Sequence, residues 1–256
     1  MGSEILDLIP PAPDYTIRYG DGEHHFGELR LPRNRGPHPL VIAIHGGFWR
    51  AMRTLSHMGH LCAALADQGI ASWNIEYCRL GQERGGWPGT AEDVAAGAAH
   101  INALSAEYPI DLSRVVVVGY SAGGQLALWL AAHRKVSVTG AVSLAGVLDL
   151  RRAWELNLGD GVVAEFLSGS PEDVPERYVA ASPVELLPFD IPTRIFHGNN
   201  DTRVPFEIAE RFAQKAAATK MDFELITLEG ADHFEIIDPT QPECTLVQRV
   251  IADLLA

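Results

Sequence analysis

The sequence has few of the features that mark secreted, membrane-spanning or disulfide-stabilised proteins. Its three cysteines, Cys62, Cys78 and Cys244, are widely spaced and form no C-x-x-C pair, so neither a disulfide framework nor a zinc ribbon is indicated. No apolar run approaches the roughly 20 residues that a membrane-spanning helix needs. Residues 1–13 lack the basic start and apolar run of a signal peptide. We therefore expect a cytoplasmic protein.

Positive charge is also scarce, because 20 Lys and Arg stand against 33 Asp and Glu, giving a net charge of −13. A protein that neutralises phosphates needs clustered basic residues, so we expect neither nucleic acid nor a membrane surface as a partner. This charge disfavours anionic ligands at long range and favours neutral or cationic small molecules. Net charge does not determine the charge of an individual pocket.

The length and composition are those of one globular domain spanning residues 1–256. At this size a chain buries roughly three quarters of its unfolded surface, so one core is sufficient without a disulfide or structural metal. The apolar content of 47% is near the globular average, and no Gly-X-Y period or long heptad repeat is present. Disordered, collagen-like and coiled-coil classes are therefore excluded.

The order of apolar runs predicts an α/β fold. An initial hairpin over Thr16–Tyr19 and Phe26–Leu31 is followed by short, continuous apolar runs that alternate with helical stretches. The runs expected to be strands are Leu40–Ile44, Ala71–Ile75, Val115–Val118, Ala141–Leu144, Thr193–Phe196 and Phe223–Leu228. The stretches expected to be helices are Ser56–Asp67, Thr90–Ala106, Gly123–Ala132, Pro205–Ala218 and Pro242–Leu254. This pattern predicts a mostly parallel sheet of about eight strands with helices on both faces.

One stretch, about residues 150–187, interrupts this alternation. It mixes Trp154, Phe166 and Leu167 with Gly, Pro and acidic residues and contains no clear strand. We expect a small helical cap inserted into the single domain, with its closure influencing which acyl and leaving groups are accepted.

The most specific motif is Gly119-Tyr120-Ser121-Ala122-Gly123, which matches G-x-S-x-G. Four valines precede it and a helical run follows it, which is the context of a nucleophile elbow. The flanking glycines allow the tight strand-to-helix turn that exposes the serine hydroxyl. A chance match or an ordinary β-α turn is the alternative, but the strand and helix on either side favour the elbow.

A serine hydroxyl needs a base and an acid to act as a nucleophile, in the chain order Ser, Asp, His for this architecture. Asp201 and His233 both follow Ser121, and each comes just after an expected strand. The carboxyl ends of the strands are where open α/β sheets place their sites. We therefore expect Ser121, Asp201 and His233 to form the catalytic triad.

Three nearby residues are alternatives for these roles. His197 lies at the end of its expected strand and is better explained as a structural residue. Asp232 is adjacent to His233, so its side chain points elsewhere. Asp149 is the remaining alternative acid.

A glycine-containing loop, His45-Gly46-Gly47-Phe48-Trp49, directly follows an expected strand. A tetrahedral intermediate needs N–H donors aimed at its oxyanion. We expect these donors to be the N–H groups of Gly47, Phe48 and Ala122, with His45 anchoring the loop.

Together these segments, with His197–Asp201 and Asp232–His233, resemble the α/β-hydrolase superfamily. The resemblance is to the branch of kynurenine formamidases (arylformamidases) and small carboxylesterases related to hormone-sensitive lipase, and it covers about Leu31 to the end. The loop sequence H-G-G-F-W is more similar to that of the formamidase-like group than to the H-G-G-G of the lipase-like group. The resemblance implies the α/β-hydrolase fold and an acyl-transfer activity.

Aromatic residues near these loops are candidates for an apolar acyl or aryl pocket. Those predicted to contact substrate are Phe48, Trp49, Trp87 and Tyr120, with ordinary core packing as the alternative. The pair His24-His25 and the acids Asp232 and Glu235 are better explained by a solvated hairpin and a catalytic loop than by a metal. We therefore expect no metal and no cofactor.

The sequence thus predicts a serine hydrolase that cleaves small carboxylic esters or N-formyl aryl amides through an acyl-enzyme on Ser121. A small peptidase similar to prolyl oligopeptidase is one alternative, although 256 residues leave no room for a large substrate-selecting domain. A ligand binder that has the fold without turnover is the other. The oligomeric state is left open between monomer and homodimer.

Overall fold

The computed structural model describes residues 2–256, so Met1 lies outside the described residues. Within that range one sheet of eight strands has the order β1-β2-β4-β3-β5-β6-β7-β8. The strands are β1 Tyr15–Arg18, β2 Phe26–Arg30, β3 His38–Ile44, β4 Ala71–Ile75, β5 Ile110–Tyr120, β6 Gly140–Leu144, β7 Thr193–Gly198 and β8 Phe223–Leu228. Antiparallel pairing joins β1 to β2 and β2 to β4, and the other neighbours are parallel. The expected mostly parallel sheet of eight strands is confirmed.

The sheet is buried on both faces, which explains its continuous apolar runs. In β5, Val115 and Val117 belong to one core cluster, and Val116 and Val118 belong to the other. Successive side chains of a strand point to opposite faces, so one run of four valines supplies both cores. All four side chains are fully buried.

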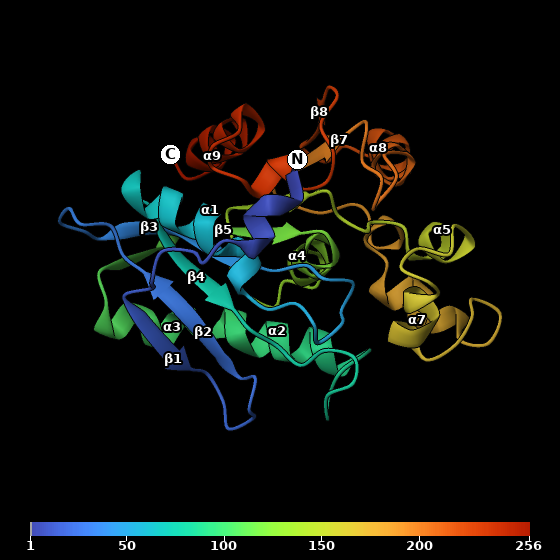
Figure 1. The fold of residues 1–256 in the computed structure, drawn as a ribbon, viewed down its shortest axis with the longest axis horizontal. Helices are drawn as coiled ribbons and strands as arrows, with labels where there is room; N and C mark the ends of the chain where they lie inside the picture. The colour runs from blue at the N-terminus through green and yellow to red at the C-terminus, as the bar shows by residue number, and fades with distance from the viewer. Residues whose placement is uncertain (1) are drawn as a thin grey trace.

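Helices cover each face in turn (Figure 1). The helices of the main body are α1 Ser56–Asp67, α2 Gly89–Ala99, α3 Ile101–Glu107, α4 Ala122–Ala132, α8 Glu207–Ala217 and α9 Pro242–Leu254. Core residues of α1 and α9 lie in one cluster, whereas those of α2, α3, α4 and α8 lie in the other. The one helix expected over Thr90–Ala106 is divided at His100 into α2 and α3. Among the described residues, no helix combines the length and apolar character needed to cross a membrane.

The segment between β6 and β7, where a helical cap is predicted, contains α5 Leu150–Glu155, α6 Val162–Leu167, α7 Pro175–Ala181 and the 3₁₀ helix η2 Pro183–Glu185. It lies at one end of the molecule (Figure 1). Asp149 begins α5 as an N-cap, because its side chain accepts a hydrogen bond from the Arg152 N–H at 3.0 Å. The Gln125 side chain of α4 donates to the Ala181 carbonyl at 2.8 Å and so attaches this cap segment to the sheet domain.

Two further 3₁₀ helices lie close to the site, and neither has a clear signal in the sequence. The first, η1 Gly2–Asp7, packs Ile5 into the core beside α1 and α9. The second, η3 Glu235–Ile237, follows the last loop of the site and buries Ile236 and Ile237. Both contribute to the same core cluster, on the face of the sheet that α1 and α9 cover.

Candidate active site

Ser121 occupies a strained turn between β5 and α4. Its φ of 56° and ψ of −122° lie in a region that L-residues rarely adopt. A Cβ on Gly119 would lie 2.0 Å from the Gly123 carbonyl oxygen, and a Cβ on Gly123 would lie 2.2 Å from the Ile44 carbonyl oxygen. Only glycine fits at these two positions, so the motif holds the serine where the turn exposes its hydroxyl above the sheet edge.

The structure brings together the three residues that the sequence predicts as a triad. The His233 Nε2 atom lies 3.0 Å from the Ser121 Oγ atom, and its Nδ1 atom lies 2.6 Å from the Asp201 Oδ2 atom. Asp201 follows β7 and His233 follows β8, at the carboxyl edge of the parallel strands. All three side chains are buried. This arrangement can pass a proton from the serine to the imidazole while the carboxylate orients the ring.

Asp201 is held as a carboxylate by the groups around it. Burial by itself raises the pKa of Asp201, but the rings of His197 and His233 and the Val204 N–H bring it well below the usual value. Its Oδ1 atom accepts hydrogen bonds from the Arg203 and Val204 N–H groups, each at 2.8 Å. The Nε2 atom of the fully buried His197 also lies 2.8 Å from the Val204 carbonyl, in keeping with its expected structural place.

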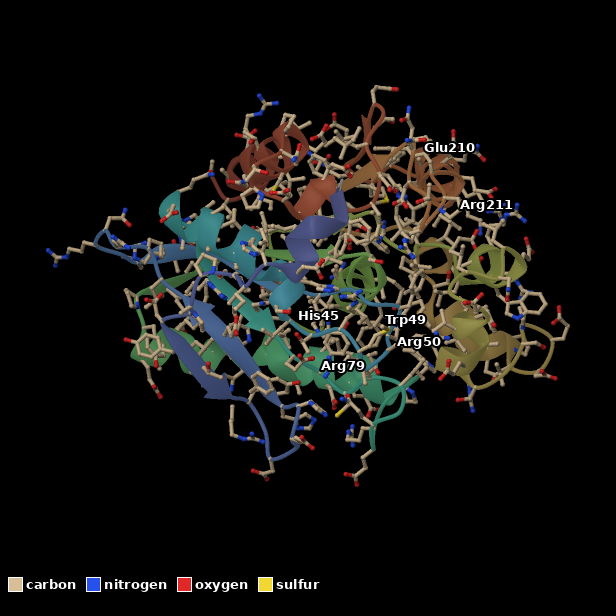
Figure 2. All side chains as sticks on the ribbon, in the orientation of Figure 1. His45, Trp49, Arg50, Arg79, Glu210 and Arg211 are labelled. Carbon is tan, nitrogen blue, oxygen red and sulfur yellow. The ribbon has the colours of Figure 1, made fainter. Side chains whose placement is uncertain are left out.

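The alternative acids point away from His233. Asp232 Oδ1 accepts a hydrogen bond from the Thr202 N–H at 3.0 Å. Asp149 caps α5, and its Oδ2 atom lies 2.8 Å from the Nε atom of Arg211 on α8. Figure 2 shows Arg211 beside Glu210, on the side of the domain that faces the cap segment. Asp201 is therefore the acid that the fold brings to the imidazole.

The loop after β3 places backbone N–H groups beside the serine. A Cβ on Gly46 would lie 2.7 Å from the Ser121 Cβ, so the loop passes directly against the nucleophile. Gly47 and Phe48 both have positive φ, 117° and 52°. Within residues 2–256 their N–H groups donate to no protein acceptor. Ala122 is the first residue of α4, so its N–H has no acceptor within the helix. These are the three groups predicted to receive an oxyanion.

A buried ionic network holds this loop in place. The His45 Nε2 atom lies 2.9 Å from Glu76 Oε1, and its Nδ1 atom lies 2.8 Å from the Gly46 carbonyl. Arg79 Nη1 also lies 3.2 Å from Glu76 Oε1. Burial alone raises the pKa of Glu76, but His45 and then Arg79 lower it below the usual value. Figure 2 shows His45 and Arg79 close together at the centre of the domain.

Sequence reasoning identified His45 as an anchor but missed the carboxylate that anchors it. Glu76 lies at the end of β4, and it directly follows Ile75, the last residue of an apolar run. The available sequence signal is an acid placed directly after an apolar strand run. In the structure Glu76 is only 1% exposed, and a buried charge needs a partner.

A cavity of about 210 Å³ opens beside Ser121 and His233. Its apolar lining comes from Leu6, Phe48, Met52, Tyr120 and Phe234. Phe48 and Tyr120 therefore lie where substrate contact is predicted. Leu6 comes from η1, so a segment without a sequence signal forms part of the wall. Among the described residues, none of the cap segment lines this cavity.

Trp49 and Trp87 do not line this cavity: Trp49 lies in the core instead, and substrate contact by Trp87 stays a prediction. Trp49 is fully buried, its ring stacks on Phe166 at 4.4 Å, and its Nε1 atom donates to Gln125 at 3.1 Å. Trp87 packs edge-on against Trp129 at 5.6 Å. A positive φ at Trp49 turns this side chain inward. Figure 2 accordingly shows Trp49 toward the cap segment, so these aromatic residues join the cap to α4.

One group of side chains has the composition of a metal site, namely His25, Cys78 and Asp93. Asp93 already has cationic surroundings, because its Oδ1 atom lies 3.2 Å from Arg84 Nε and 3.1 Å from His25 Nε2. Burial and then Asp93 raise the pKa of the Cys78 thiol to about 12. The donor set fits an ion-pair cluster better than a metal centre.

Comparison with known sequences identifies a family and a curated relative. The BD-FAE family model matches residues 28–216. A probable isoprenylcysteine alpha-carbonyl methylesterase of Arabidopsis thaliana is 28% identical over 138 residues, which are 52% of this chain. The chain spans only 28% of the length of that relative.

Comparison with solved structures identifies the same fold in esterases. A truncated form of a carbohydrate esterase from gut microbiota has a TM-score of 0.85 at 19% identity, covering 96% of this chain and 99% of that one. A bifunctional GH43-CE protein of Bacteroides eggerthii has a TM-score of 0.83 at 21% identity, covering 94% of this chain and 35% of that one. The expected α/β-hydrolase fold is confirmed.

Proposed function

The chain belongs to the BD-FAE family, and on this premise we propose that it is a serine esterase that cleaves small carboxylic esters. The observation that carries the proposal is the unbroken contact from Asp201 through His233 to Ser121, at 2.6 and 3.0 Å. The methylesterase and carbohydrate esterase among the similar proteins support an ester as the substrate class.

In the first half of the proposed reaction, the Ser121 Oγ atom attacks the ester carbonyl carbon. His233 Nε2 takes the hydroxyl proton, and Asp201 stabilises the imidazolium through Nδ1. The negative charge that develops on the carbonyl oxygen is stabilised by the N–H groups of Gly47, Phe48 and Ala122. Collapse of the tetrahedral intermediate expels the alcohol, which leaves with the proton from His233.

The second half reverses these roles. His233 takes a proton from water, and the resulting nucleophile attacks the acyl group on Ser121. A second tetrahedral intermediate forms at the same N–H groups. Its collapse releases the carboxylic acid and returns the proton to the serine. Protein groups and water complete the cycle, so the mechanism needs no cofactor.

An N-formyl aryl amide is a second candidate substrate, because the His45–Trp49 loop resembles that of the formamidase-like group. About 210 Å³ beside Ser121 suits a short acyl group, of which formyl is the smallest. Nitrophenyl esters of increasing acyl length and N-formylkynurenine, assayed side by side, distinguish the two substrates. Turnover of short esters with no turnover of the formyl amide above background would refute the formamidase assignment.

Hydrolysis of 4-nitrophenyl acetate by the wild type and by Ser121→Ala tests the esterase proposal. We expect the wild type to turn over the ester and the variant to lose activity by a factor on the order of 10⁶. Retention of most of the activity by Ser121→Ala would refute the mechanism. A wild type that binds esters without hydrolysing them would instead identify a non-catalytic binder.

A further inference from the structure

The cavity beside Ser121 is basic, although the chain as a whole has a net charge of −13. Its lining includes three arginines, Arg50, Arg53 and Arg203. Within the described part of the chain, no Asp or Glu lines it. The Debye length at physiological ionic strength is about 8 Å, so these nearby groups outweigh distant surface acids for a bound ligand.

Two of the three arginines have no acidic partner. Arg50 contacts the cap segment, where it lies 3.0 Å from the Gly159 carbonyl and 3.3 Å from Glu165 Oε2. Across residues 2–256, neither Arg53 nor Arg203 forms an ion pair. The Arg203 guanidinium lies 6.0 Å from the centre of the Phe234 ring, which also lines the cavity. Both guanidinium groups are therefore available to a ligand.

The backbone of each available arginine is attached to the catalytic machinery. The Arg203 N–H donates to Asp201 Oδ1 at 2.8 Å. The Arg53 carbonyl accepts a hydrogen bond from Arg79, the same residue that contacts Glu76 below the oxyanion loop. The two side chains thus arise from fixed points on separate loops around one cavity. Binding groups placed in this way lose little backbone freedom when a ligand is bound.

His57 adds an unused polar group to the same wall. Its side chain is buried, with 7% exposed, and among the described residues its Nδ1 atom has no hydrogen-bond partner. Burial, followed by the positive charges of His45 and Arg53, lowers the pKa of His57 to about 3. The ring is therefore neutral at pH 7 and can donate or accept a hydrogen bond. A buried polar group without a partner is costly unless a ligand or water satisfies it.

We propose that this cavity selects esters that carry a carboxylate within a few bonds of the scissile carbonyl, with Arg53 and Arg203 binding the carboxylate and His57 supplying a hydrogen bond. The inference rests on the proposed esterase function. A guanidinium matches the planar geometry of a carboxylate and binds it through two parallel N–H donors. The preference for neutral or cationic substrates expected from net charge is therefore reversed at this site.

Two matched substrates test the proposal: monomethyl succinate, whose carboxylate lies three bonds from the ester carbonyl, and its neutral analogue methyl succinamate. The measured quantity is the ratio of their kcat/KM values, carboxylate over amide, in the wild type and in the double variant Arg53→Gln/Arg203→Gln. We expect this ratio to fall by at least about tenfold in the double variant, because a charge-assisted hydrogen bond is equivalent to roughly one tenfold step or more. An unchanged ratio would overturn the proposal.

Two further variants separate the local effect from net charge and from misfolding. Arg33→Gln/Arg35→Gln removes the same charge from the exposed loop before β3, at the opposite edge of the sheet, and should leave the ratio within about twofold of the wild type. Arg53→Lys/Arg203→Lys keeps the charge and should retain part of the preference. A ratio that fell equally in the Arg33/Arg35 variant would show a general charge effect and contradict the assigned site.

The same assay separates failure of this inference from failure of the esterase proposal. Hydrolysis of both substrates by the wild type, with a ratio that Arg53 and Arg203 do not affect, overturns the carboxylate site alone. Absence of hydrolysis of either substrate overturns both. Thermal unfolding of each variant shows whether a loss of both activities comes from the fold.

Discussion

Two regions meet at the cavity beside Ser121 and are held in different ways. The first, which we term the catalytic assembly, consists of buried side chains with hydrogen-bond partners: Ser121, His233, Asp201, His45 and Glu76. The second, the rim, consists of side chains that reach solvent from two loops: Arg50, Met52, Arg53 and Arg203. The exposed fraction of Met52 is 75%, whereas that of His45 is zero.

On the proposed function, the buried assembly performs the reaction, whereas the exposed rim selects the substrate. A catalytic assembly needs fixed geometry, and burial with complete hydrogen bonding provides it. The rim needs accessible groups that a substrate can reach, and within residues 2–256 two of its three arginines, Arg53 and Arg203, form no ion pair. Residues 45–49 and 50–53 are adjacent in one loop, yet the first part belongs to the assembly and the second to the rim.

Among changes that leave the nucleophile in place, replacing Asp201 should produce the largest effect, because it breaks the assembly at its orienting group. Asp201→Asn is expected to lower kcat for 4-nitrophenyl acetate by up to about 10⁴-fold, since an amide holds the His233 ring in the wrong tautomer. Asp232→Asn is the matched control, because Asp232 bonds to Thr202 instead. Comparable losses in the two variants would contradict the assignment of Asp201.

Replacing Glu76 should have the next largest effect, and it should lower both the free energy of unfolding and kcat. Glu76→Gln leaves His45 and Arg79 without their buried counter-charge, which costs roughly 3–5 kcal/mol of unfolding free energy. Urea unfolding measures this loss, and a lower kcat would report displacement of the oxyanion loop. The control is Glu92→Gln, which removes an exposed partner of Arg84 and should cost less than about 1 kcal/mol. Equal costs would show that burial does not distinguish the two ion pairs.

The contribution of Glu76 should also depend on pH. Its folded-state pKa is lowered, so the stabilisation is complete above the unfolded-state value of about 4.3 and is lost as pH falls through the folded value. The stability difference between wild type and Glu76→Gln should therefore be constant from pH 7 to 6 and shrink between pH 4 and 3. Urea unfolding across this range measures it. A stability difference that grew as the pH fell would contradict the lowered pKa of Glu76.

The smallest effect on stability is expected at the rim. Arg50→Gln removes an ion pair with Glu165 in which both side chains are more than one third exposed, so unfolding free energy should change by less than about 1 kcal/mol. Urea unfolding of the variant, compared with Glu165→Gln, measures it. A loss above about 2 kcal/mol in both would show that the rim is a structural part of the cap.

The sequence predicted elements best where apolar periodicity is strong and the ends carry a clear signal. The strands Ala71–Ile75 and Phe223–Leu228 and the helices Ser56–Asp67 and Pro242–Leu254 have the predicted bounds. In contrast, β5 begins at Ile110, five residues before the valine run. The added residues pair with the start of β3, but most of them are polar, so the apolar pattern does not predict them.

Within the site, the sequence predicts best those residues whose backbone conformation only certain residue types can adopt. Ser121 and the loop at Gly47 were predictable because their turns require particular residues at fixed spacing. Glu76 was not, because His45 is 31 residues away in the sequence and only the fold brings the two together. The place of His57 and Arg53 in the cavity wall has no local sequence signal either. Trp49 shows the opposite error, since an aromatic next to a catalytic loop can turn inward to the core.

The most direct test of the account is to identify the residue that reacts with a fluorophosphonate probe. A serine activated by His233 at 3.0 Å should be phosphonylated, and peptide mass spectrometry should locate the modification on Ser121. Labelling should disappear in Ser121→Ala and fall sharply in His233→Ala. Undiminished labelling of Ser121→Ala, or a modification at another residue, would contradict the proposed nucleophile.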